Sequence, residues 1–230
     1  MKTALIVGAG SGNSAALTRL LASKGYQVHL AARDITKLHD LCHQTNANAH
    51  VADAKDPASV KALFDAVQGR LDVVVANPSA RVRGPVATLD ADEVKHAIDV
   101  TAFGSFLVGQ QAAARMLAQS IEDGARGTIL FTGASAGVKG FAQSAAFAMG
   151  KFAQRGLAQS MARELHPQGI HVAWINIDGG IRNPGRVEPA DNPDSMLDPD
   201  AVAQSYFSLI SQHRSAWSDE LSIRPWVEKF

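Results

Sequence analysis

Residues 4–14 read ALIVGAGSGNS, a short apolar run that leads directly into a glycine-rich loop. The apolar part has the length of a buried strand, and the residues after the loop have a helical pattern. Glycines at such a junction permit a tight turn and let backbone amides approach a diphosphate at the amino end of the helix. This arrangement predicts a dinucleotide-binding loop, with a ligand-free tight turn as the alternative. The predicted loop contacts are Gly8, Gly10, Ser11, Gly12 and Asn13.

The rest of the chain alternates short apolar runs with longer amphipathic stretches, which is typical of a parallel sheet covered by helices. We therefore expect a single-domain α/β Rossmann fold over residues 1–230, a doubly wound parallel sheet with helices on both faces. The predicted strands are Ala4–Val7, Val28–Ala31, His50–Ala52, Val73–Ala76, Thr128–Phe131, His171–Ile175 and Glu220–Ile223. The predicted helices are Ser14–Ser23, Ile35–His43, Pro57–Val67, Ala91–Gln119, Gln143–Leu165 and Pro199–Gln212.

Composition argues against several classes of partner. Lys and Arg number 22, as do Asp and Glu, so no net charge attracts nucleic acid or an anionic membrane. The only cysteine, Cys42, excludes an internal disulfide, and the His39 and His43 pair has no convincing third metal ligand. We expect a cytoplasmic protein without a metal site.

A proline-rich stretch covers residues 183–199, late in the chain. In a doubly wound sheet the ligand crevice opens at the carboxyl ends of the strands. We predict that this stretch is a lid loop over that crevice.

Two further segments give the chain a family resemblance. Residues 127–137, GTILFTGASAG, and residues 147–153, FAMGKFA, together with the glycine loop, resemble the short-chain dehydrogenase/reductase family. The resemblance implies a nicotinamide cofactor and a catalytic quartet of Asn, Ser, Tyr and Lys. Ser14 stands at the position of the third family glycine.

The resemblance also shows a departure at the catalytic positions. Lys151 matches the family lysine, whereas Phe147, Ala134 and Thr101 stand at the tyrosine, serine and asparagine positions. A one-residue shift of the loop would make Ser135 the orienting serine. Loss of the tyrosine hydroxyl removes the usual acid–base group, which contributes roughly 10²–10⁴ in rate. Of the two tyrosines in the chain, Tyr206 is expected to pack within the last helix.

The cofactor positions are assigned partly from chemistry and partly from the resemblance. The second strand ends in Arg33 with no carboxylate before it, which favours NADP(H) over NAD(H), since a guanidinium suits a 2′-phosphate. A solvated arginine is the alternative. The resemblance places Asp53 at the adenine, Asn77 beside the adenosine, and Gly179 and Ile181 near the carboxamide. Each of these could instead be structural.

Two functions remain open at this point. One is an NADP(H)-dependent oxidoreductase with an atypical site, acting on a small carbonyl or enoyl substrate. The other is a catalytically inactive NADP(H)-binding sensor or oligomer partner. The resemblance further implies a homodimer or homotetramer formed through the two long helices.

Overall fold

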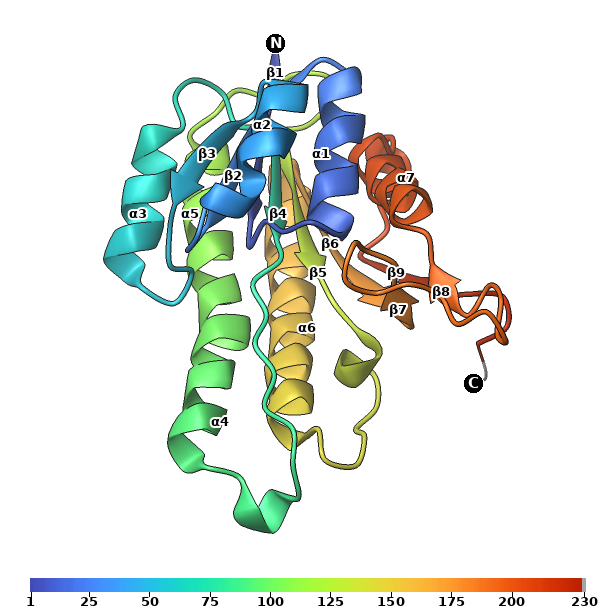
Figure 1. Cartoon of the computed structure of the whole chain (residues 1–230). Coiled ribbons are helices and arrows are strands. Elements are labelled where there is room, and N and C mark those ends of the chain that lie inside the picture. Colours follow the sequence, from blue (N-terminus) through green and yellow to red (C-terminus); the bar gives the residue numbers. More distant parts are fainter. Residues whose placement is uncertain (229–230) are drawn as a thin grey trace.

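A seven-stranded parallel sheet forms the centre of the computed structural model, which describes residues 1–228 (Figure 1). The strand order is β3-β2-β1-β4-β5-β6-β9, and every neighbouring pair is parallel. The predicted doubly wound fold is therefore confirmed. The strands are β1 (Lys2–Val7), β2 (Tyr26–Ala32), β3 (Asn48–Val51), β4 (Val73–Ala76), β5 (Gly127–Thr132), β6 (Ile170–Ile177) and β9 (Glu220–Ile223).

Helices cover both faces of this sheet. One apolar core joins the sheet to α1 (Asn13–Ser23), α2 (His39–Thr45) and α7 (Pro199–Ile210). The other joins it to α3 (Pro57–Ala66), α5 (Gly104–Leu117) and α6 (Ala145–Leu165). Figure 1 shows α1 and α7 side by side, and these two helices share extensive contacts. Strands β4, β5 and β6 are buried throughout, so they read in the sequence as continuous apolar runs.

The long helix predicted over Ala91–Gln119 is interrupted. It consists of α4 (Ala91–Ile98), a π-helical turn at Asp99–Phe103, and α5. A π-turn inserts one extra residue without changing composition or apolar pattern, so nothing in the sequence marked it. Thr101, one of the predicted site positions, lies in this turn and is almost completely buried.

Two other helix starts differ from prediction. Gln143 has φ of +59°, a left-handed conformation that cannot belong to an α-helix, so α6 begins at Ala145. The predicted helix Ile35–His43 starts as a 3₁₀ turn, Thr36–Leu38, before α2. Asp34 accepts hydrogen bonds from the backbone and hydroxyl of Thr36, which fixes that tight first turn.

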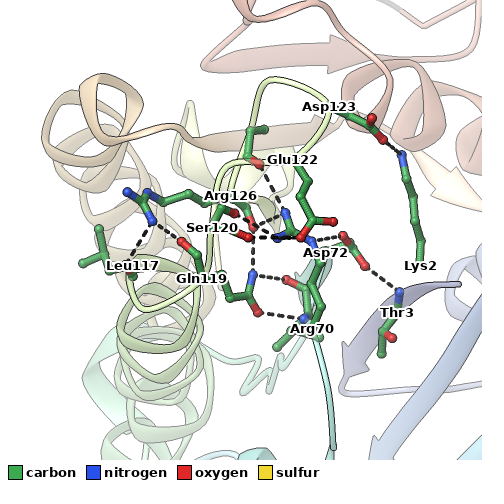
Figure 2. Close-up of polar contacts among 12 residues, drawn as sticks. Lys2, Thr3, Arg70, Asp72, Leu117, Gln119, Ser120, Glu122, Asp123 and Arg126 are labelled. Atoms are coloured by element: carbon green, nitrogen blue, oxygen red, sulfur yellow. Dashed lines mark hydrogen bonds and ion pairs between the residues drawn. The ribbon is translucent and has the colours of Figure 1, made fainter.

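A polar network holds the amino ends of the strands, opposite the ends that carry the predicted crevice (Figure 2). Asp72, just before β4, accepts from the Thr3 backbone at 2.8 Å and from Arg70 Nε at 2.8 Å. Gln119 bonds both backbone groups of Leu71. These half-buried contacts tie β1 and β4 to the loop before β5, so this end of the sheet is a structural clamp.

The predicted lid region forms a loop closed at its base. A short parallel pair, β7 (Gly180–Ile181) and β8 (Met196–Leu197), brackets it, and Arg182 forms an ion pair with Asp198 beside that pair. Asp198 also caps α7 by accepting from the Asp200 and Ala201 backbone. No helix among residues 1–228 combines the length and apolar character needed to cross a bilayer.

Candidate active site at the carboxyl edge of the sheet

Three adjoining cavities follow the carboxyl ends of the strands. An inner groove of about 440 Å³ runs over β1 and β2, and its lining includes Arg33 and Asp53. A central cavity of about 250 Å³ reaches from the glycine loop to Lys151. An outer cleft of about 440 Å³ continues past Phe147. The three share lining residues, Asn77 between the first two and Phe147 between the last two, and so form one continuous site.

The glycine loop is held tightly against the end of β4. Gly8 has φ of +85°, and a Cβ there would lie 2.8 Å from the carbonyl carbon of Asn77, so only glycine fits. The Asn77 side-chain amide donates to Gly8 O at 2.9 Å and to Ser14 Oγ at 3.0 Å. Asn77 therefore braces the loop, and Ser14 provides a hydrogen bond that the family glycine could not.

The open side of the loop has room and polarity for a ligand. A Cβ added at Gly10 would meet nothing within 4 Å, and a Cβ added at Gly12 would lie 3.6 Å from Asn183 Cβ. Asn13 Oδ1 is buried and has no hydrogen-bond partner among residues 1–228, although Asn13 lines the central cavity. This oxygen is available to accept a hydrogen bond from a ligand in the cavity, and the Asn13 side chain also interacts with that of Tyr206. Ser11, the remaining residue of the loop, is exposed. The loop thus fits a dinucleotide that bridges the inner groove and the central cavity.

The lining of the inner groove carries two cations, Arg33 and Lys37, and two carboxylates, Asp34 and Asp53. Arg33 and Lys37 are exposed there, and neither has an ion pair within the described residues. Asp34, a carboxylate beside them, accepts from the Thr36 hydroxyl, and this hydrogen bond lowers the pKa of that carboxyl and favours its charged form. Asp53 also lines the groove, with Oδ1 accepting from the Lys55 backbone at 3.2 Å. Arg33 is the exposed guanidinium of this groove, and its fork of N–H donors can pair with a phosphate.

Lys151 extends from α6 into the floor of the central cavity. Its side chain is almost fully buried, and Nζ donates to Thr132 O at 2.6 Å and to Gln154 Oε1 at 3.2 Å. Burial, with a smaller effect from the positive charge of Arg81, lowers the pKa of Lys151 to about 7. The amine can therefore gain or lose a proton at neutral pH, which an exposed lysine does not do.

A buried hydrogen-bond chain leads from Lys151 toward the π-turn. Gln154 Nε2 donates to Ser105 Oγ at 2.8 Å, and Ser105 Oγ donates to Thr101 O at 2.6 Å. The Thr101 hydroxyl accepts from the Ala80 backbone at 3.0 Å instead of facing the cavity. Thr101 therefore fixes the loop after β4, whereas Gln154 orients the lysine.

The residues predicted to replace the family tyrosine and serine lie at the same two cavities. Phe147 and Ala134 both line the central cavity and the outer cleft, and Phe147 is one turn of α6 from Lys151. The Arg81 guanidinium carbon lies 4.1 Å from the centroid of the Phe147 ring. Ser135 lines only the outer cleft, in the short 3₁₀ turn after β5. The structure thus brings Phe147, Ala134 and Lys151 together at one cavity and leaves Ser135 further out.

Three residues of this region were not predicted as part of the site. Gln154 and Arg81 have just been described. Tyr206 is fully buried on α7 as predicted for packing, but its hydroxyl also bonds Thr132 Oγ1 at 2.8 Å, and burial raises the pKa of Tyr206 to about 12. In the sequence, one feature indicated a role for Gln154: it is a polar residue three positions after Lys151, on the same face of the helix. Arg81 lies in a loop, where no periodic pattern places a side chain.

The loop after β6 closes the other side of the cavity. Gly179 and Ile181 line it, and Gly179 has φ of +152° with Pro225 2.8 Å from the position of an added Cβ. Asp178 lies within 3.7 Å of Arg224 and borders the outer cleft. Residues 1–228 contain no group of three or more His, Cys, Asp or Glu side chains arranged to hold a metal ion.

Comparison with known proteins places this geometry in context. The family model for short chain dehydrogenases matches residues 2–185. A trans-4-hydroxycyclohexanecarboxylate dehydrogenase of Sinomonas cyclohexanicum is 30% identical over 197 residues, covering 80% of this chain and 73% of that protein. A short-chain dehydrogenase structure from Rhodopseudomonas palustris has a TM-score of 0.82 at 32% identity, covering 98% of this chain and 99% of that one. A metagenomic short-chain oxidoreductase in complex with NADP has a TM-score of 0.83 at 28% identity, covering 99% and 98%.

Proposed function

Because the chain belongs to the short-chain dehydrogenase family, whose members are oxidoreductases that bind nicotinamide dinucleotides, we propose that it is an NADP(H)-dependent oxidoreductase. The substrate is a small carbonyl or enoyl compound bound in the outer cleft. The observation that carries the proposal is the continuous site in which the glycine loop, the unpaired Asn13 oxygen and Lys151 face one cavity. The polar cavity for the cofactor adjoins a cleft for the substrate. This arrangement suits hydride transfer, because that reaction depends mainly on how the two molecules are positioned.

Each part of the dinucleotide has a candidate partner. The backbone amides of Gly10, Ser11, Gly12 and Asn13 would hold the diphosphate at the amino end of α1, where the helix dipole favours negative charge. Gly8, whose own amide donates to Ala31 O, would shape the turn that lets the diphosphate approach. Arg33 would pair with the 2′-phosphate and Asp53 with the adenine, while Asn77 braces the adenosine side. Lys151 would hold the nicotinamide ribose, and Gly179 and Ile181 would lie by the carboxamide. When bound, the nicotinamide supplies or accepts the hydride.

Proton transfer in this site falls to Lys151. Phe147 has no proton to give, and Tyr206 is sealed behind Thr132 with a pKa raised to about 12. Lys151 has a pKa lowered to about 7 and lies at the cavity floor. We propose that its ammonium group donates the proton during reduction, directly or through a water molecule. Gln154 and Thr132 hold the amine in place during this step.

The cofactor assignment is tested by titrating the protein with NADPH and NADH and following nicotinamide fluorescence. We expect NADPH to bind at least about 10-fold more tightly than NADH, because a charged hydrogen bond to the 2′-phosphate contributes about 1.5–3 kcal/mol. Arg33→Ala should remove most of this preference. Arg163→Ala, an exposed arginine on α6, is the matched control and should retain it.

Equal affinity for both cofactors in the wild type would contradict the NADP(H) assignment, and no binding of either would contradict the proposed function. Turnover is then sought with a panel of ketones, aldehydes and enoyl thioesters. Tight NADPH binding with no turnover on any of them would indicate the inactive sensor instead.

The loop over residues 183–199 is proposed to act as the lid of the substrate cleft. Its base is held by the β7–β8 pair, and Arg186 on the loop lines both the central cavity and the outer cleft. Movement of this segment would therefore change access to Phe147 and Lys151.

We also propose that the protein forms a homodimer or homotetramer through α5 and α6. Large apolar side chains are exposed along these helices and the turn before them, namely Phe103, Phe106, Met149 and Phe152. Phe103 and Phe106 stack with ring centroids 6.0 Å apart. Such a patch is typical of an interface between subunits.

Light scattering during size-exclusion chromatography tests this assembly. The wild type should elute with the mass of two or four chains, and Phe106→Glu should shift it toward the monomer, because a carboxylate in an apolar interface must be desolvated. Val187→Glu, on the exposed loop away from α5 and α6, is the control and should leave the mass unchanged. A wild-type monomer would contradict the proposal.

A further inference from the structure

Three arginines face the outer cleft without carboxylate partners. Arg81, Arg83 and Arg186 line it, and within residues 1–228 none of their guanidinium groups forms an ion pair or hydrogen bond. By contrast, Arg70, Arg155 and Arg182 each pair with a nearby carboxylate. The cleft therefore gathers cations whose bonding capacity is unused.

Two of these arginines are placed at the reaction centre rather than at the rim. Arg81 and Arg186 line both the outer cleft and the central cavity that holds Lys151. Arg81 lies over the Phe147 ring, 4.1 Å from guanidinium carbon to ring centroid. This stacking leaves the edge of the guanidinium, with its N–H donors, available to a ligand beside the ring.

The charges in the cleft do not balance. Its lining contributes four cations, Arg81, Arg83, Lys139 and Arg186, against two carboxylates, Asp178 and Glu228. Asp178 already lies 3.7 Å from Arg224, outside this set. Burial, and then repulsion from Arg83 and Arg186, lowers the pKa of Arg81. Clustered cations with few counter-charges raise the local concentration of anions and are relieved by binding one.

We propose that the substrate carries an oxyanion group, a carboxylate or a phosphate, which Arg81 and Arg186 bind beside Phe147. The inference rests on the proposed function, because it names the substrate class of the same site. Planar guanidinium groups bind both kinds of oxyanion through paired N–H donors. In this arrangement the arginines position the substrate, a task that the family serine and tyrosine hydroxyls, absent at Ala134 and Phe147, would otherwise share.

The test compares probes that share a formylphenyl group and carry an anionic or an uncharged para substituent. Isothermal titration calorimetry measures binding of 4-formylbenzoate, 4-formylphenyl phosphate and the uncharged methyl 4-formylbenzoate to the full chain, first without cofactor. At least one anion should bind about 10-fold or more tightly than the ester, since hydrogen bonds to charged groups exceed neutral ones by about that factor. Which anion binds more tightly distinguishes a carboxylate substrate from a phosphate one.

Variants assign the preference to the arginines. Arg81→Gln and Arg186→Gln should each reduce the anion-to-ester ratio several-fold, whereas Arg163→Gln on the exposed face of α6 should preserve it. Circular dichroism of each variant confirms that the fold is intact. An ester that binds as tightly as both anions, or a ratio unchanged in Arg81→Gln and Arg186→Gln, would overturn the inference.

A second titration separates substrate from cofactor. On protein saturated with NADP⁺, which carries the same phosphates but cannot reduce an aldehyde, the anion preference should persist, because the arginines serve the substrate. Loss of anion binding in the presence of NADP⁺ would show that the arginines hold the cofactor's own phosphates, and this too would overturn the inference. Failure of NADPH binding itself would count against the proposed function and leave the cofactor-free result standing.

Discussion

Replacing Lys151 with methionine is expected to lower kcat/KM for carbonyl reduction by roughly 10²–10⁴, the range contributed by a positioned acid. The buried amine is the one titrating group at the cavity floor, with its pKa lowered to about 7. Methionine has similar length, so the α6 packing around Phe147 should persist. Steady-state kinetics with NADPH measures the loss.

The pH profile distinguishes proton donation from a purely structural role. During reduction the ammonium form is required, so kcat/KM should fall as pH rises through about 7 in the wild type. The reverse oxidation needs the neutral amine and should rise over the same range. Lys151→Arg keeps a charge that does not titrate there, and its profile should be flat near neutrality. A wild-type profile that is flat through pH 7 in both directions would contradict the role of Lys151.

The lowered pKa of Lys151 should also make the free energy of unfolding depend on pH. Burial lowers the folded-state pKa of Lys151 to about 7 from the 10.5 of the unfolded chain. Between these values the unfolded state binds more protons, so the free energy of unfolding should rise with pH across this window. The rise should be absent in Lys151→Met, as measured by urea denaturation at several pH values.

Phe147→Tyr is expected to raise kcat/KM for simple ketones by roughly 10²–10⁴, because it supplies a hydroxyl at the position of the family acid. The ring already lines both cavities, and its centroid lies 6.0 Å from Lys151 Nζ and 4.1 Å from the Arg81 guanidinium carbon. Both positive charges would lower the pKa of a phenol there and favour proton transfer. Adding Ala134→Ser should increase the gain by orienting the carbonyl.

Phe141→Tyr is a closely matched control for this gain. Phe141 lines the outer cleft and also lies near a lysine, with Lys139 Nζ 5.5 Å from the ring centroid, but unlike Phe147 it does not line the central cavity that contains Lys151. The control should leave ketone reduction unchanged. A Phe147→Tyr variant no faster than wild type, with NADPH binding intact, would show that the missing hydroxyl does not limit this site.

The sequence predicted the fold closely because its signals are local. Strand Val73–Ala76 agrees with the structure residue for residue, since a buried strand is a continuous apolar run with polar neighbours. The final strand Glu220–Ile223 also agrees, although it lies at the edge of the sheet and its residues are half-buried or exposed. The π-turn at Asp99–Phe103 and the start of α6 at Ala145 were missed. One depends on a single extra residue in a helix and the other on the left-handed backbone of Gln143, and neither changes the apolar pattern.

The site was predictable only where a motif fixes the spacing. The resemblance placed Phe147, Ala134 and Lys151, and the structure brings all three to one cavity. It did not indicate that Asn77 braces Gly8 or that Gln154 holds the lysine. Arg81 and Arg186 come from loops distant in sequence, so their convergence on the cleft depends on the tertiary fold.

Binding of NADP(H) in the inner groove and the central cavity is tested most directly by one measurement. Fluorescence titration of the wild-type protein with NADPH should show saturable binding, with NADH bound about 10-fold or more weakly. Saturation with NADPH and weak binding of NADH is the result that the structure predicts. The absence of saturable binding by NADPH would contradict the assignment of the glycine loop, Arg33 and Lys151 to a cofactor site.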